Sequence, residues 1–147
     1  MPTLRSMGEN AVVEALLRRL PPLSGLVRVG PGDDCAVVAA PETGRDQLLK
    51  TDCVVEGVHF ERGEDLQRVG WKALCRALSD VAAMGGTPRC ALLTVLFEKE
   101  MELRRAEALF VGIARAAEAF GVDVVGGETG HTSGPLVCNV ALTGWVE

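Results

Sequence analysis

Five acidic side chains differ from the other acids of the sequence because each lies beside glycines or at the end of an apolar segment. They are Asp33, Asp34, Asp52, Asp80 and Glu128. Such positions are typical of loops that leave a rigid scaffold, whereas the acids of the stretch 98–107 are typical of solvated helix surface. Magnesium prefers oxygen ligands, usually a few carboxylates with waters and substrate phosphates. If the five side chains converge, they predict binding of a divalent cation and of phosphate.

Most of these acids also have a local structural explanation. Asp33 and Asp34 follow Gly-Pro-Gly, where aspartate is common in turns. Asp80 lies in the last turn of a predicted helix, where the helix dipole disfavours a carboxylate, so a positive group is expected beside it. That group is either Arg76, one turn earlier, or a bound cation shared with other carboxylates. Asp52 interrupts a strand-like run, which places it at a strand end or facing a site.

Two further segments have a composition that suits a binding site. Gly126 and Gly127 precede Glu128 directly after a short apolar run, and successive glycines let backbone N–H groups approach a phosphate. The segment matches neither the P-loop nor the dinucleotide-binding pattern. His59 lies beside a glycine and near Glu56, so a structural hydrogen-bonding role and a role in a loop facing a site are equally weighted.

The elements that must position these residues follow from hydrophobic periodicity. Apolar residues three and four apart predict helices, and apolar runs bounded by turn residues predict strands. The polar segment 126–135 is expected to be a loop. The predicted order is a helix at about 7–20, strands at 35–40 and 47–55, a helix at 66–82, a strand at 90–97, a helix at 103–120, and strands at 122–125 and 136–146. This order indicates an α+β fold, a mixed β-sheet with helices packed on one face.

The strand segments are apolar on both faces, although helices on one side cover only one of them. The other face therefore predicts a partner.

Composition limits the classes of function. The chain has 147 residues, 48% of them hydrophobic, and a formal net charge of -5. It predicts a single domain, 1–147, without the basic field that binds nucleic acid. Scattered cysteines without a C-x-x-C motif indicate free thiols in a reducing cytoplasm. No apolar run suits a membrane span or an export signal, so neither a membrane nor an exported location is expected.

Taken in order, four motifs resemble the N-terminal domain of thiamine-monophosphate kinases. They are GDDCAV at 32–37, TDCVVEGVHF at 51–60, LSDVAAMG at 78–85 and GGET at 126–129. The superfamily also contains aminoimidazole ribonucleotide synthetase, selenophosphate synthetase and the hydrogenase-maturation carbamoyl dehydratase, and the EGVHF segment favours the thiamine kinases among them. The resemblance covers nearly the whole chain. It implies a homodimer, in which the sheets of two such domains join into a barrel and the active site lies at the seam.

The activity that the resemblance implies is transfer of the γ-phosphoryl group of ATP to the phosphate of thiamine monophosphate, giving thiamine diphosphate. No covalent catalytic residue is expected, because phosphoryl transfer depends on positioning and charge neutralisation. By motif, the magnesium ligands would be Asp33 or Asp34, Thr51, Asp52, Asp80 and Glu128; the nucleotide would lie at Gly126, Gly127 and Glu128; and Glu56 and His59 would lie on the thiamine phosphate side.

The sequence departs from the family pattern at three points. Glu128 stands where the kinases usually carry aspartate, and GGET also occurs in the aminoimidazole ribonucleotide enzyme. Ala77 replaces an asparagine. The second domain of the family, which completes the substrate sites, is absent from these residues. Two alternatives therefore stand beside the kinase: another ATP-dependent enzyme of the superfamily, and a non-catalytic dimerisation domain with this fold.

Overall fold

The computed structural model describes residues 27–29, 33–40 and 44–146. The helix predicted at about 7–20 lies outside these residues. In chain order the elements are β1 (Val27–Val29), β2 (Ala36–Ala40), β3 (Arg45–Val55), α2 (Leu66–Ala83), β4 (Thr87–Glu98), α3 (Leu103–Phe120), β5 (Asp123–Thr132) and β6 (Val137–Val146). Neither helix of this described part has a stretch apolar enough to cross a lipid bilayer.

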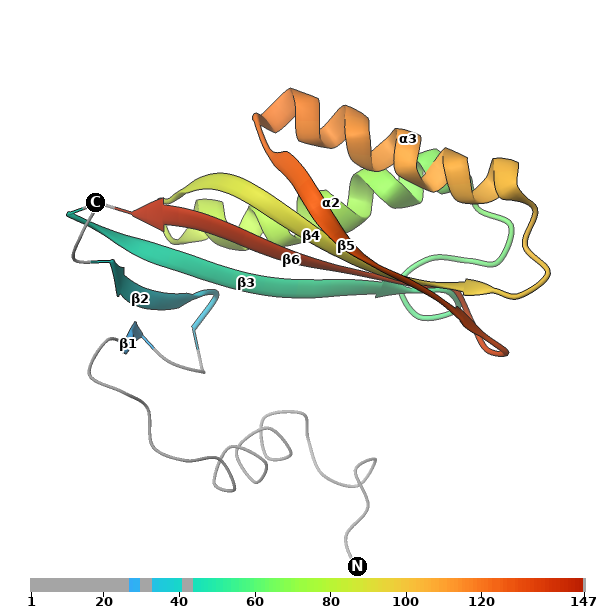
Figure 1. The fold of residues 1–147 in the computed structure, drawn as a ribbon, viewed down its shortest axis with the longest axis horizontal. Coiled ribbons are helices and arrows are strands. Elements are labelled where there is room, and N and C mark those ends of the chain that lie inside the picture. The colour runs from blue at the N-terminus through green and yellow to red at the C-terminus, as the bar shows by residue number, and fades with distance from the viewer. Residues whose placement is uncertain (1–26, 30–32, 41–43, 147) are drawn as a thin grey trace, which may run out of the picture.

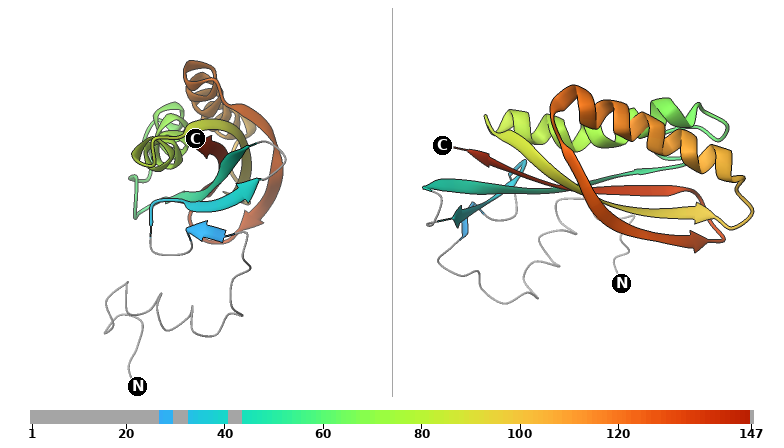
Figure 2. Two further views of the ribbon diagram at one scale, coloured as in Figure 1. Left: turned by 90° about the vertical axis from the view of Figure 1, so that its left-hand side faces the viewer. Right: turned by 45° about the horizontal axis from the view of Figure 1, so that its top comes forward.

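The strands form one mixed sheet in the order β1-β2-β3-β6-β4-β5. The strands β4 and β5 pair in parallel, and α3 connects them; the other neighbouring strand pairs of the described residues are antiparallel. Both helices lie on the same side of the sheet (Figures 1 and 2). The predicted α+β fold with helices on one face is therefore confirmed.

The sheet has a helix-covered face and an open face, because successive strand side chains point to opposite sides. The helix-covered face carries the buried side chains Leu48, Val54, Ala91, Leu93, Val95, Cys138, Val140 and Leu142. The open face carries the alternate residues, among them Leu49, Thr51, Leu92, Thr94, Asn139 and Ala141. The core of the described residues lies between the first face and the helices.

The helix α2 begins where Asp65 caps it, since the Asp65 carboxylate accepts a hydrogen bond from the backbone N–H of Gln67 at 2.9 Å. It packs on the sheet and against α3. The two helices approach closely at Gly70 and Gly112, where an added Cβ atom would lie 2.0 Å from the Leu109 carbonyl oxygen and 1.9 Å from that of Gln67. The glycines are required there because no larger side chain fits between the two backbones.

The loop predicted at 126–135 is wrong for most of its length, because β5 continues to Thr132. Gly126 and Gly127 have φ angles of 153° and 151°, which side chains rarely adopt. A Cβ atom on Gly127 would lie 1.8 Å from the carbonyl oxygen of Leu93 on β4. The glycines thus let β5 pass β4 at close range beside a register shift at Ala91 and Leu92, and the strand resumes beyond them.

Candidate functional site

Asp80 pairs with a residue that the sequence analysis did not single out. Its carboxylate forms an ion pair with the ammonium group of Lys50, which reaches it from β3. Of the two alternatives for the positive group beside Asp80, the pair with Arg76 along the helix is wrong, since no such pair forms among the described residues. Asp80 lies near the C-terminal end of α2, where the helix dipole disfavours a carboxylate. Lys50 supplies the positive charge that this position requires.

Asp52 pairs with Arg76 instead. One nitrogen of the Arg76 guanidinium donates to Oδ1 of Asp52 at 3.2 Å and a second at 3.4 Å. Asp52 Oδ1 also accepts from the backbone N–H of Cys53 at 2.8 Å. Asp52 and Lys50 are two residues apart on β3 and share the helix-covered face, so α2 lies within reach of both.

Lys50 pairs with Asp80 and is also influenced by the charge of Asp52. Burial works against its charged form, but the hydrogen bond to Asp80 and the charges of Asp80 and Asp52 outweigh this, and the pKa of Lys50 is raised above its ordinary value. We call the group formed by Lys50, Asp52, Arg76 and Asp80 the β3–α2 charge cluster.

Asp33 and Asp34 lie at the edge of this cluster. The β2–β3 register ends with Ala36 opposite Leu49, so the chain before it passes beside Lys50. The pKa of the buried Cys35 thiol reflects this proximity. Burial raises the pKa of its thiol, Lys50 lowers it, and the charges of Asp80, Asp34 and Asp33 raise it further. Both aspartates are exposed, and Oδ1 of Asp33 accepts from the backbone N–H of Asp34 at 2.8 Å.

Thr51 and Glu128 lie away from the charge cluster. Thr51 is on the open face, where its hydroxyl donates to Oδ1 of Asn139 at 3.0 Å. Glu128 is exposed on β5, in register with Thr94 of β4. Because β6 and β4 separate β5 from β3, Glu128 lies three strand spacings from Asp52, about 14 Å. Ligands of one magnesium ion lie within about 4 Å of one another, so these two carboxylates do not share an ion within one protomer.

The oxygen donors of the cluster fit magnesium in type. Among the described residues, however, no three acidic, histidine or cysteine side chains are grouped closely enough to hold an ion. The geometry of Asp52 and Asp80 explains this, because each carboxylate turns towards a cation of the chain itself. An ion that binds here must compete with Lys50 and Arg76.

The segment 56–60 forms a tight turn at the end of β3. His59 Nδ1 accepts from the backbone N–H of Val55 at 3.0 Å, and the ammonium group of Lys72 donates to the His59 carbonyl oxygen. Gly57, with a φ angle of 77°, permits the turn, and Phe60 is buried beneath it. The structural role weighed for His59 is thus present, and its Nε2 atom is left for another partner.

Glu56 has structural partners of its own. Its carboxylate is 13% exposed, accepts from the backbone N–H of Leu136 at 3.3 Å and lies 3.8 Å from the guanidinium group of Arg62. It joins β3 to the start of β6. The EGVHF turn begins four residues beyond Asp52, about 13 Å along the strand, so the residues predicted for the thiamine phosphate lie apart from the predicted magnesium ligand Asp52.

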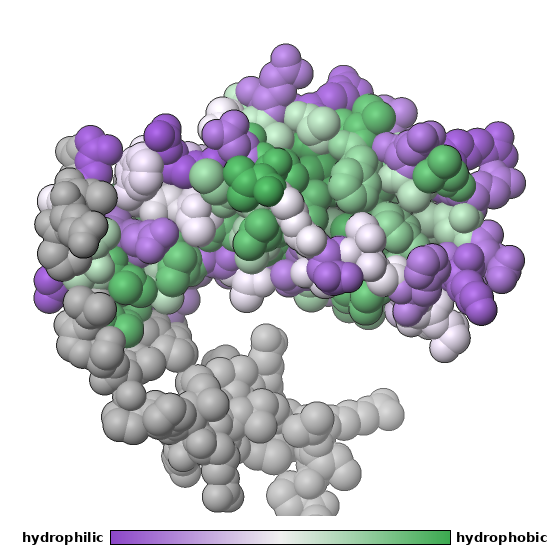
Figure 3. Space-filling model, in the orientation of Figure 1, coloured by the Kyte–Doolittle hydropathy of each residue, from purple (hydrophilic) through white to green (hydrophobic). Residues whose placement is uncertain are grey.

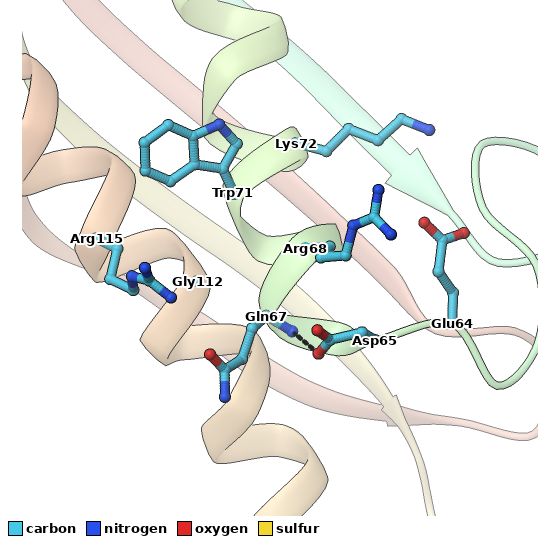
Figure 4. Close-up of a pocket in the computed structure, with 8 residues that line it drawn as sticks. All are labelled: Glu64, Asp65, Gln67, Arg68, Trp71, Lys72, Gly112 and Arg115. Atoms are coloured by element: carbon cyan, nitrogen blue, oxygen red, sulfur yellow. Dashed lines mark hydrogen bonds between the residues drawn. The ribbon is translucent and has the colours of Figure 1, made fainter.

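A cleft of about 510 Å³ lies elsewhere, between α2 and α3. Figure 4 shows its lining, with Arg68 and Trp71 projecting from α2 and Arg115 from α3. None of the acidic residues singled out in the sequence lines it. An apolar hollow of about 330 Å³ lies on the open face, lined among others by Leu49, Leu92 and Val125.

Sequence patterns signalled the carboxylates of the cluster but missed Lys50. The available signal was strand alternation, which places Lys50 and Asp52 on the same face as the buried Leu48. A lysine on the covered face of a strand requires a partner.

The comparisons with known proteins agree with the motifs. The thiamine-monophosphate kinase of Rhodopirellula baltica is 38% identical over 82% of this chain and 40% of its own length. That of Aquifex aeolicus is 36% identical over 98% of this chain and 44% of its own length. A solved structure, AaThiL complexed with AMPPCP and TMP, matches with a TM-score of 0.88 and 33% identity, over 100% of this chain and 45% of that one.

The chain thus spans less than half the length of these relatives. A structure of the HypE–HypF complex shares the fold, with a TM-score of 0.70 at 20% identity over 92% of this chain and 42% of that one. The family described as AIR synthase related protein, N-terminal domain, matches residues 32–146, which include β2 to β6 and both helices. The resemblance inferred from the four motifs is confirmed, and this chain belongs to the AIR synthase related protein family through its N-terminal domain.

Proposed function

We propose that this chain is the N-terminal half of a thiamine-monophosphate kinase, which transfers the γ-phosphoryl group of ATP to thiamine monophosphate. The observation that carries the proposal is the convergence of Asp52 and Asp80 on one face, around Lys50. The similarity to a protein solved with AMPPCP and TMP supports it. The thiol-rich composition suits a cytoplasmic enzyme, since all five cysteines are free.

The residues that would hold magnesium are Asp52 and Asp80, with Asp33 or Asp34 at the edge, and the ion would bind there together with ATP, whose phosphates supply further oxygen ligands. When bound, the ion would neutralise charge on the nucleotide phosphates. Asp52 and Asp80 have side-chain exposures of 19% and 26%, so they are reachable from solvent yet partly desolvated. Partial burial strengthens their attraction for a cation.

Other residues would act at a distance from that ion. Glu128 would hold a separate ion from β5, beside a nucleotide at Gly126 and Gly127. Thr51 would supply its hydroxyl oxygen to a magnesium ion from the open face, and His59 would present Nε2 to the thiamine phosphate. Glu56 would support that side by fixing the turn to β6.

A homodimer belongs to the same proposal. The open face carries Leu92, which is 50% exposed, with Leu49 and Val125 around an apolar hollow. In the view of Figure 3, apolar surface lies over α3 and β5; α3 belongs to the helix-covered side, so only the β5 part of this surface adjoins the hollow, through Val125. Two open faces packed together would close the sheets into a barrel and cover these side chains.

Calorimetric titration with Mg-ATP tests the proposal. We expect the 147-residue chain to bind Mg-ATP. The variant Asp52→Asn should not bind it, because a neutral amide replaces the charged carboxylate. Asp46→Asn is the matched control: it lies on the same strand, about 20 Å away, and pairs with Arg28. No binding at millimolar nucleotide would favour a non-catalytic dimerisation domain.

Activity on thiamine monophosphate separates the kinase from its relatives. The measurement is made on a chain extended by the second domain. Conversion of the precursor of aminoimidazole ribonucleotide, in place of thiamine monophosphate, would assign the protein to the alternative, an enzyme like aminoimidazole ribonucleotide synthetase.

A further inference from the structure

Lys50 holds an unusual position for a lysine. It lies on the helix-covered face of β3 with a side-chain exposure of only 19%. A lysine side chain loses several rotatable bonds when it is held in one geometry, and its ammonium group loses water when it is buried. The chain offsets these costs through Asp80, which contacts the ammonium group, and through the nearby charge of Asp52.

The charges of the β3–α2 charge cluster balance within the chain. Asp52 and Asp80 carry one negative charge each, and Lys50 and Arg76 carry one positive charge each. Carboxylates brought together without a counter-ion would repel one another and favour a divalent cation. Here Asp52 and Asp80 are each neutralised by a cation of the chain before any metal binds.

The two cations of the cluster differ in accessibility and chemistry. Arg76 is 39% exposed and lies towards solvent, whereas Lys50 is half as exposed, pairs with Asp80 and is also influenced by the charge of Asp52. Lysine is also a compact point charge on a flexible stem, while arginine is a planar fork. Of the two, the Lys50 ammonium group is the one that resembles a small bound cation in size and placement.

We propose that the Lys50 ammonium group is the resident cation of the Asp52–Asp80 pair and takes the place of one divalent ion, which binds there only weakly while Lys50 is present. The proposal rests on the proposed function for the identity of the metal. It adds a residue that sets how many ions the site holds. A divalent ion close to the ammonium group is repelled by it, and the ion has no second free carboxylate to offset that repulsion.

Removal of the charge at position 50 tests this directly. The experiment titrates the 147-residue chain with Mn²⁺, a paramagnetic substitute for Mg²⁺, and counts free ions by electron paramagnetic resonance. We expect Lys50→Met to bind one more Mn²⁺ than the wild type, at least tenfold more tightly than any site of the wild type in this region. Mg²⁺ should also raise the melting temperature of Lys50→Met more than that of the wild type, since it binds the folded state.

The matched control is Lys72→Met. Lys72 is also a lysine whose ammonium group has a partner in the chain, but that partner is the His59 carbonyl oxygen and not a carboxylate of the cluster. Its replacement should leave Mn²⁺ binding unchanged. Equal Mn²⁺ stoichiometry and affinity in Lys50→Met and the wild type would overturn the proposal, as would an equal gain in Lys72→Met.

A second pair of variants covers the case in which Lys50→Met does not fold. Lys50→Arg keeps the charge and should keep the weak binding of the wild type, whereas Lys50→Gln removes the charge in a polar side chain and should gain the ion. An additional bound Mn²⁺ in both Lys50→Arg and Lys50→Gln, or in neither of them, contradicts the proposal.

The outcome is separable from that of the proposed function. Mn²⁺ titration needs neither nucleotide nor phosphoryl transfer. If the chain fails to bind Mg-ATP and Lys50→Gln still gains an ion, the kinase assignment fails and the role of Lys50 stands. If Mg-ATP binds and no charge-removing variant gains an ion, the role of Lys50 fails alone.

Discussion

At the residue scale, the side chains that matter most are paired across elements. Asp52 and its partner Arg76 are 24 positions apart in the sequence, and Lys50 and Asp80 are 30 apart. Periodicity placed Arg76 and Asp80 on neighbouring turns of one helix, where a pair between them was the simple expectation. The strand under the helix supplied a better partner for each. Pairing of this kind depends on how α2 lies on β3, which local sequence does not specify.

A buried thiol gives a prediction at the same scale. Burial raises the pKa of Cys138 to about 12, with a further contribution from Cys53. A cysteine in an unfolded chain has a pKa of about 8.5. Between these values the unfolded chain has lost the proton that the folded chain keeps. The free energy of unfolding therefore falls as pH rises through this range, by up to about 1.4 kcal/mol per pH unit from this group.

Cys138→Ala should remove that part of the slope. The measurement is urea unfolding at several pH values between about 8 and 10.5. Val140→Ala is the control, because it opens a cavity on the same strand and face without removing an ionisable group. It should lower stability at every pH and leave the slope as in the wild type. Equal slopes in Cys138→Ala and the wild type would contradict the prediction.

At the element scale, the sequence predicted what periodicity controls. The helices at 66–82 and 103–120 agree with α2 and α3 to within a residue, because apolar positions repeat over the full length of each. The strand β1 was not predicted, since its three residues carry no pattern. The strand β5 was cut short at Gly126, because glycines indicate loops unless a neighbouring backbone is known to approach. Likewise, the acidic positions were recognised by type, but their separation across the sheet follows from strand order alone.

The close crossing of α2 and α3 predicts a large effect of a small substitution. Gly112→Ala would place a methyl group 1.9 Å from the Gln67 carbonyl oxygen, so the helices must separate. We expect a loss of about 1–3 kcal/mol in the free energy of unfolding, measured by chemical denaturation followed by circular dichroism. Gly134→Ala should change stability by less than about 0.5 kcal/mol, because its nearest contact is Thr132 Oγ1 at 3.4 Å.

That outcome runs against intrinsic helix propensity. In an isolated helix alanine is favoured over glycine by about 1 kcal/mol, so a stabilised Gly112→Ala would show that the helices do not cross at this distance.

At the scale of the whole molecule, the helices and the charge cluster occupy one side of the sheet and apolar strand residues occupy the other. The open face combines Leu92 with the apolar hollow, and it also carries the Thr51–Asn139 hydrogen bond. Its exposed residues come from strands that are far apart in sequence but adjacent in the sheet. A surface of this composition is typical of an interface core, in which buried apolar contacts supply most of the affinity.

The last prediction concerns this face. Leu92→Lys would place a charge at the centre of the proposed dimer, where burial without a partner is costly, and we expect the dimer dissociation constant to rise by at least about tenfold. Leu103→Lys, on an exposed leucine of α3, should leave it unchanged. Sedimentation equilibrium at tens of micromolar protein distinguishes the two. A monomeric wild-type chain at that concentration would exclude the open face as a dimer interface, since Leu49, Leu92 and Val125 are exposed among the described residues and available for association.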